Sequence, residues 1–179
     1  MTDDLAVLKI ISERLETERI AFMLTGSFAL AYYATPRMTR DLDFVVACEE
    51  RNVAQLVSAF SPDFYIDEDA ARSAVRLQRL FNLMHLKSGL KVDMIVRKDS
   101  DYRIKEFERR QRVQMGNVAT WIVSREDLII SKLVWARDSG SELQRRDVRT
   151  LLAPALDTQY VTDWASRLGI ADLWNEVRT

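Results

Sequence analysis

Apolar residues along this chain alternate between short β-branched or aromatic runs and longer stretches with helical spacing. Short apolar runs are typical of buried strands, and apolar positions three and four residues apart are typical of amphipathic helices. We expect strands at 22–24, 42–46, 79–86, 90–96 and 118–123, and helices at 4–18, 28–33, 49–60, 101–111, 128–137, 143–151, 157–168 and 170–177. The pattern predicts an α/β (α+β) fold in which helices flank a small mixed β-sheet and a helical segment ends the chain.

The chain length indicates the domain organisation. Its 179 residues suit one domain with a small helical appendage. We expect a core over 1–123 and a C-terminal helical segment over 124–179 that packs on this core. Because no apolar run approaches the roughly 20 residues that span a bilayer, and the acidic start is unlike a signal peptide, we expect a cytoplasmic protein with no membrane partner.

Cysteine and histidine each occur once, as Cys48 and His85. A single cysteine excludes an internal disulfide and a cysteine-based zinc site. His85 stands in an apolar strand, where a hydrogen-bonded structural histidine is expected rather than a catalytic base. The sequence therefore gives no basis for a redox centre or for a Ser-His-Asp hydrolase.

Two aspartates, Asp41 and Asp43, stand one residue apart at the start of a predicted strand. Side chains two positions apart on a strand share a face, so these carboxylates would project side by side. Such a pair repels, and is stable when one member takes a proton or a cation lies between the two. Mg²⁺, or Mn²⁺ in its place, suits these ligands. The alternative is that both are turn residues that open the strand.

A glycine and a serine, Gly26 and Ser27, lie between the strand at 22–24 and the helix at 28–33. Glycine allows a ligand to approach the backbone closely, and a helix N-terminus offers free N–H groups to an anion. This corner therefore predicts a phosphate site, with an ordinary turn and helix cap as the alternative. The loop that follows carries Arg37 and Arg40, which would neutralise a phosphate or pair with the aspartates.

A third carboxylate, Asp93, stands in the middle of the apolar strand 90–96. A charge at such a position needs a partner or a metal, because an unpaired buried carboxylate is strongly unfavourable. Asp93 is therefore a candidate third metal ligand or a general base. The alternative is an ion pair with Lys91 or with a nearby arginine.

Charged residues also interrupt the apolar faces of two later helices. Lys132 and Arg137 fall within the apolar arc of the helix at 128–137, where a cation either points at an anionic group or extends from the edge of the face. Asp147 shares the apolar stripe of the next helix and could pair with either cation. Between 97 and 149, Lys and Arg outnumber Asp and Glu, which suits a polyanionic substrate, although mixed-sign runs also occur on solvated helices.

The order of these residues resembles the signature of a known superfamily. Gly26-Ser27, then Asp41-x-Asp43, and later Asp93 are similar to the motif of the nucleotidyltransferases with a polymerase-β-like palm. Further on, four patterns look like motifs of AbiEii-type nucleotidyltransferases, which include toxins of abortive-infection and toxin–antitoxin systems: Lys91-x-Asp93, Glu126–Lys132, Lys132-x-x-x-x-Arg137 and Arg146-Asp147. The resemblance covers about residues 22–152.

This resemblance implies a fold, an activity and roles for individual residues. It implies a metal-dependent enzyme that transfers a nucleotide from an NTP to a hydroxyl acceptor and releases pyrophosphate. The acceptor would be RNA, tRNA or protein, and a cognate antitoxin would be a partner. Divalent metal would lie on Asp41, Asp43 and Asp93, and the triphosphate would contact Gly26, Ser27, Arg40, Lys132 and Arg137; the roles of Arg37, Lys91 and Asp147 stay open.

One departure from the family and one alternative function remain. The toxins are usually much longer, so the acceptor and any toxin activity are open. The alternative is a non-catalytic module that keeps the fold and binds nucleotide, RNA or a partner protein. A phosphohydrolase fits less well, because such sites usually draw on histidine and only His85 is present.

Overall fold

The computed structural model describes residues 2–34 and 41–179, so Arg37 and Arg40 lie outside the described residues. The strands are β1 (Ala21–Thr25), β2 (Asp41–Ala47), β3 (Phe64–Ile66), β4 (Leu80–His85), β5 (Lys91–Val96), β6 (Gln111–Met115) and β7 (Val118–Ile122). The helices are α1 (Thr2–Thr17), α2 (Gly26–Tyr33), α3 (Val53–Phe60), α4 (Glu68–Arg76), α5 (Asp101–Glu108), α6 (Arg125–Ser139), α7 (Glu142–Leu151), α8 (Thr158–Arg167) and α9 (Ala171–Arg178), with a 3₁₀ turn at Glu50–Asn52.

Over these residues the strands form one seven-stranded sheet in the order β3-β4-β5-β2-β1-β7-β6. The central β2 pairs parallel with β5 and antiparallel with β1, and β1 in turn pairs parallel with β7. The outer pairs β3–β4, β4–β5 and β6–β7 are antiparallel. The mixed sheet flanked by helices confirms the predicted fold class.

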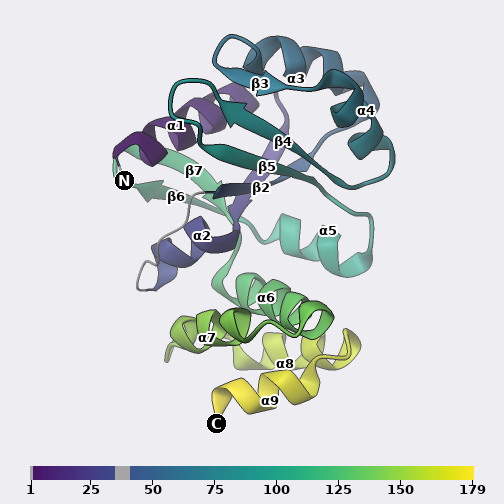
Figure 1. The fold of residues 1–179 in the computed structure, drawn as a ribbon. Coiled ribbons are helices and arrows are strands. Elements are labelled where there is room, and N and C mark those ends of the chain that lie inside the picture. The colour runs from purple at the N-terminus through teal and green to yellow at the C-terminus, as the bar shows by residue number, and fades with distance from the viewer. Residues whose placement is uncertain (1, 35–40) are drawn as a thin grey trace.

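Helices cover both faces of the sheet (Figure 1). One side carries α1, α3 and α4, and the other carries α2, α5 and α6, with α7, α8 and α9 packed beyond α6. Side chains of β2 point alternately to the two faces of the sheet. Leu42, Phe44 and Val46 are fully buried on the first side. Asp43 and Val45 lie between them, so their side chains point to the second side, toward α6.

Two strands were not predicted. The helix expected at 101–111 ends at Glu108, and Gln111 already belongs to the edge strand β6. Gln111, Arg112 and Gln114 are exposed there, so the strand lacks the apolar alternation that reveals a half-buried strand. The other is the short edge strand β3, which the helix α4 follows, in a segment for which the sequence analysis named no element.

Two polar residues have local structural roles, and for His85 this is the role expected from the sequence. Asp67 is the N-cap of α4, and its carboxylate accepts a hydrogen bond from the Ala70 N–H at 2.9 Å, so the acidic run there serves the helix start. His85 ends β4, and its Nδ1 lies 2.7 Å from the Ser88 hydroxyl. The histidine is therefore a bonded structural residue at the β4–β5 turn.

A buried carboxylate joins the sheet side of the molecule to the C-terminal helices. Asp127 is fully buried at the start of α6, where Ser124 caps the helix. Its carboxylate accepts hydrogen bonds from Arg109 Nε at 3.0 Å and from the Tyr160 hydroxyl at 2.8 Å. These bonds link the end of α5 to α6 and α8, and so fix the position of α6.

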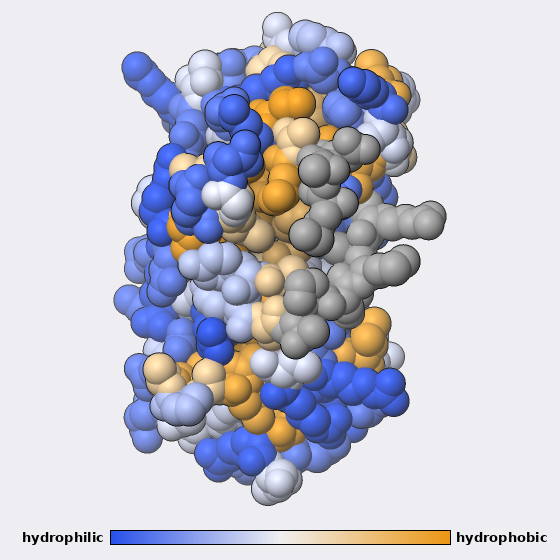
Figure 2. Space-filling view, turned by 90° about the vertical axis from the view of Figure 1, so that its left-hand side faces the viewer, coloured by the Kyte–Doolittle hydropathy of each residue, from blue (hydrophilic) through white to orange (hydrophobic). Residues whose placement is uncertain are grey.

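The surface is largely polar. Figure 2 shows the side of the molecule on which the N-terminus lies, where hydrophilic residues dominate the outline and apolar residues form a stripe down the middle. Within the part of the chain that the structure describes, no helix has both the length and the apolar character needed to cross a bilayer.

Candidate active site

A row of polar side chains crosses four strands on the sheet face that points toward α6. Asn82 of β4 lies opposite Asp93 of β5, Asp93 opposite Asp43 of β2, and Asp43 opposite Thr25 of β1. Residues in register on adjacent strands are about 5 Å apart and share a face. The parallel register of β2 and β5 therefore places two carboxylates of distant sequence position side by side.

The carboxylate of Asp43 rests against the backbone at the start of α2. Gly26 has φ of +64°, and a Cβ added to it would lie 1.9 Å from Asp43 Oδ2. Burial, first, and then the charges of Asp93 and Asp41 raise the pKa of Asp43 above its ordinary value. The Gly-Ser corner and the aspartate pair predicted from the sequence thus meet at one point.

The carboxylate of Asp93 has two partners of its own. Lys91 Nζ lies 2.9 Å from Oδ1 and 3.1 Å from Oδ2 of Asp93. On the other side, the Asn82 side-chain amide donates a hydrogen bond to Oδ1. The ion pair weighed in the sequence analysis as the alternative is therefore present, in addition to the neighbouring Asp43.

The carboxylates fit a divalent cation that arrives with a polyphosphate. Among residues 2–34 and 41–179, no group of three or more His, Cys, Asp or Glu side chains is arranged to hold a metal ion. Asp43 and Asp93, however, are neighbours, and their mutual charge is one cause of the raised pKa of Asp43. Mg²⁺ commonly uses one or two carboxylates and takes its other ligands from water and substrate phosphates. The pair meets that requirement without a closed protein cage.

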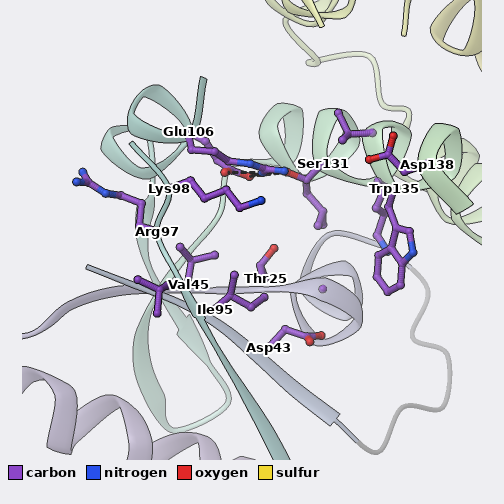
Figure 3. Close-up of a pocket in the computed structure, with 16 residues that line it drawn as sticks. Thr25, Asp43, Val45, Ile95, Arg97, Lys98, Glu106, Ser131, Trp135 and Asp138 are labelled. Atoms are coloured by element: carbon purple, nitrogen blue, oxygen red, sulfur yellow. Dashed lines mark hydrogen bonds and ion pairs between the residues drawn. The ribbon is translucent and has the colours of Figure 1, made fainter. Parts of the chain in front are cut away.

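A cavity of about 340 Å³ adjoins the carboxylates, between the sheet and the helices α5 and α6. Val45 and Ile95 give it an apolar floor, and Figure 3 shows Thr25 and Lys98 directed into it. Arg97, next to Lys98, points away from the cavity (Figure 3). Trp135 of α6 lines the cavity and is 57% exposed, so the indole lies at its open side.

The predicted cation Lys132 reaches this cavity, in a buried position. Its residue is only 3% exposed, and Nζ lies 2.7 Å from Asp147 Oδ2 and 3.0 Å from Gln144 Oε1. Lys132 also attracts Asp43, because its charge opposes the rise in the pKa of that carboxyl. The pairing of Asp147 with Lys132 is the one considered from the sequence.

The other predicted cation, Arg137, is not among the residues that line the cavity. Its guanidinium donates to the Leu168 carbonyl at 2.6 Å and to Asp138 Oδ1 at 2.7 Å, at the junction of α8 and α9. Five residues on an α-helix turn the side chain by about 140°. Arg137 is therefore directed away from Lys132, and here it holds the C-terminal helices.

Several residues of the site were not found in the sequence. Arg103 lines the cavity, yet it is engaged by Glu106 at 2.8 Å and by the Ser131 hydroxyl at 2.7 Å. Lys98, by contrast, makes no ion pair or hydrogen bond with a described residue. Asn82 and Trp135 carried weak signals, as a polar residue in a strand and as an aromatic residue on a cation-bearing helix.

The contact between Gly26 and Asp43 leads to a stability prediction. Gly26→Ala should lower the free energy of unfolding by more than Gly140→Ala, because both glycines have a positive φ but an added Cβ at Gly140 meets nothing within 4 Å. The left-handed conformation alone costs an alanine about 1–2 kcal/mol. In an Asp43→Gly background the two substitutions should have equal effects. Urea unfolding measures the free energy of unfolding of all five variants. If Gly26→Ala still lowers it by more than Gly140→Ala in the Asp43→Gly background, the contact with Asp43 is not the cause.

The raised pKa of Asp43 leads to a pH prediction. Between the ordinary aspartate pKa, about 3.9, and its raised value, the folded protein binds more protons than the unfolded chain, so this group lowers the free energy of unfolding as pH rises. Asp93→Asn should lower the pKa of Asp43, although burial keeps it above the ordinary value. Carboxyl ¹³C NMR titration measures this shift, with Asp69→Asn as the control. An ordinary pKa for Asp43 in the native protein would refute the electrostatic argument.

Comparison with known proteins agrees with this geometry. A family model described as "Nucleotidyltransferase of unknown function (DUF6036)" matches residues 2–164. No protein with a curated description matches the chain at a significant level.

Solved structures share the fold. A protein from Thermotoga maritima that is described as a nucleotidyltransferase is 17% identical, with a TM-score of 0.56 over 81% of this chain and 92% of its own. The lincosamide adenylyltransferase LnuA, with lincomycin bound, is 12% identical, with a TM-score of 0.53 over 80% of this chain and 93% of its own. ANT(2″)-Ia, in complex with adenylyl-2″-tobramycin, is 12% identical, with a TM-score of 0.56 over 99% and 98%.

At these identities the solved structures show the fold alone, whereas the family model covers most of the chain. The resemblance to the nucleotidyltransferase superfamily is confirmed, and the narrower likeness to AbiEii-type proteins stays a prediction. The chain belongs to the nucleotidyltransferase family of unknown function (DUF6036).

Proposed function

We propose that the protein is a nucleotidyltransferase that moves a nucleoside monophosphate from an NTP to a hydroxyl acceptor. The observation that carries the proposal is the in-register pair Asp43 and Asp93 beside the glycine that opens α2. A Cβ at position 26 would collide with the Asp43 carboxylate, so the glycine allows this carboxylate to lie next to the N-terminus of α2. A nucleotide with its cation needs both, since phosphates bind helix N-termini and the cation binds the carboxylates.

The chain's own groups divide the work of the reaction. The N–H groups at the start of α2 would hold phosphate oxygens, and Lys132 and Lys98 would offset their charge. Asp43 and Asp93 would hold a divalent cation, Mg²⁺ or Mn²⁺, which would supply positive charge to the phosphates and lower the pKa of an acceptor hydroxyl. The acceptor oxygen attacks the α-phosphorus, the bond to the bridging oxygen breaks, and pyrophosphate leaves.

Asp93 is suited to receive the proton of the acceptor hydroxyl. Its carboxylate is oriented by Asn82 and lies on the side of Asp43 away from Thr25 and α2. Phosphates held at α2 would therefore leave the Asp93 side of the row open to the acceptor. The exposed Asp41, on the same face of β2, would add negative charge toward the cation.

The cavity is suited to the nucleoside part of the NTP. Its floor of Val45 and Ile95 is apolar, and the indole of Trp135 offers a stacking surface at the open side. Lys98 is directed into the same space, and its ammonium makes no hydrogen bond or ion pair with a described residue (Figure 3). One ligand with a planar base and a polyphosphate would satisfy all of these groups.

The main prediction concerns transfer activity. Asp43→Asn and Asp93→Asn should each lower the rate by at least about 10²-fold, because each removes a group that acts on charge in the transition state. The measurement is transfer of label from α-³²P NTPs, with pyrophosphate release, in Mg²⁺ or Mn²⁺. Acceptors are total tRNA, protein, and aminoglycoside and lincosamide antibiotics. Asp69→Asn, an exposed aspartate in α4, is the matched control.

Two outcomes would contradict this prediction. Wild-type protein that binds Mg-NTP in calorimetry but releases no pyrophosphate with any acceptor would favour the non-catalytic module. Full activity in Asp43→Asn would place the chemistry elsewhere. The acceptor class and a cognate antitoxin are predictions from the sequence that rest on the same proposal, whereas the predicted cytoplasmic location is independent of it.

A second prediction concerns nucleotide binding. Lys98→Met should weaken NTP binding about tenfold, since a charge-assisted contact to phosphate contributes about 1.5–3 kcal/mol. Lys105→Met, an exposed lysine of α5 outside the cavity lining, should bind as the wild type does. Tryptophan fluorescence should fall when NTP binds, and Trp135→Phe should abolish that change. Equal affinities of the two lysine variants would remove Lys98 from the site.

A further inference from the structure

A cation already lies among the carboxylates of the site. Lys91 opens β5 two residues before Asp93, so both side chains share one face. Its Nζ contacts both oxygens of Asp93, at 2.9 and 3.1 Å, and Lys91 is in register with Asp41 on β2. One ammonium group therefore stands where three carboxylates of two strands converge.

This position conflicts with direct coordination of a metal by Asp93. An ammonium that bridges both oxygens fills the side of the carboxylate on which a cation would bind. Mg²⁺ needs oxygen ligands at about 2.0–2.1 Å and tolerates little distortion of its octahedral geometry. Lys91 contacts both oxygens of Asp93 and the Asn82 amide takes a further site at Oδ1, and the ammonium also repels a second cation nearby, so a divalent cation has to compete with Lys91 for Asp93.

The structure allows Lys91 to leave and Asp93 to stay. The Lys91 side chain is 41% exposed, whereas that of Asp93 is 17% exposed. A lysine has a flexible four-carbon stem, so its ammonium can move without a shift of the backbone. The amide of Asn82 bonds Asp93 Oδ1 from the neighbouring strand and would keep the carboxylate oriented after the ammonium moves.

We propose that Lys91 is a built-in counter-ion: it holds Asp93 until a divalent cation arrives with the nucleotide, and its ammonium then moves to the polyphosphate. This inference rests on the proposed function, which assigned no role to Lys91. The ligand is a complex of a divalent cation with a polyphosphate, not the free cation. Lys91 thereby makes the binding of the cation depend on the nucleotide.

The proposal has a thermodynamic consequence. A free cation must displace the ammonium into water, so it binds weakly. In the presence of NTP the displaced ammonium gains phosphate oxygens as partners, so both ligands bind better together than alone. Such coupling is reciprocal, which means that the cation tightens nucleotide binding by the same factor. Removing the ammonium should strengthen binding of the free cation and weaken the coupling.

The test uses the full chain and Mn²⁺ alone, with free Mn²⁺ measured by electron paramagnetic resonance. Lys91→Met should bind Mn²⁺ about tenfold tighter than the wild type. Lys87→Met is the matched control, because Lys87 is an exposed lysine of the β4–β5 turn and its loss changes the net charge equally. With a non-hydrolysable NTP analogue, the factor by which Mn²⁺ tightens nucleotide binding should be smaller in Lys91→Met than in the wild type.

The outcomes separate this inference from the proposed function. Equal or weaker Mn²⁺ binding by Lys91→Met, with binding still lost in Asp43→Asn, overturns the role of Lys91 and leaves the cation site intact. Absence of Mn²⁺ binding in every variant, with and without the analogue, overturns both. A second variant, Lys91→Gln, keeps a hydrogen-bond donor toward Asp93 but removes the charge, and it should change Mn²⁺ affinity in the same direction as Lys91→Met.

Discussion

The repulsion between Asp43 and Asp93 is the constraint on which the site depends. Backbone pairing of β2 with β5 places these carboxylates side by side, and the buried residues on the other face of both strands fix that register. A slip of one residue would turn Leu42 and Val92 toward the cavity and both aspartates into the core. The apolar packing of the sheet thus imposes an unfavourable contact between like charges at one defined place.

Three surrounding groups reduce this repulsion in different ways. Lys91 forms an ion pair with Asp93, Asn82 donates a hydrogen bond to it, and Lys132 acts on Asp43 from α6. The pKa of Asp43 is nevertheless raised, so the compensation is incomplete. Further positive charge would therefore lower the electrostatic energy of the site. Because Lys132 belongs to α6, this helix is part of the site together with the sheet. The cavity is lined by residues on both sides of the predicted domain boundary after residue 123, because α6 forms one of its walls. That boundary stays a prediction.

The sequence contained the parts of the site that depend on local pattern. The spacing of Asp41 and Asp43 follows from the period of a strand, and a charge within an apolar strand identified Asp93. The orientation of side chains on the helices was harder to predict. Helical spacing placed Lys132 and Arg137 on one apolar arc, but the width of that arc could not show which side meets the cavity. Lys98 lies two residues beyond the end of β5, and only the packing of α5 and α6 makes its position significant.

The buried pair of Lys132 and Asp147 needs an explanation beyond stability. Both residues are almost inaccessible to solvent, and their charged atoms lie 2.7 Å apart. A buried ion pair is weak evidence for stability, because apolar residues of similar volume often serve as well. An apolar pair, however, could not place a positive charge beside Asp43. Lys132 lines the cavity, and Asp147 and Gln144 bind its ammonium group. We therefore infer that these two residues orient the charge of Lys132 toward the site.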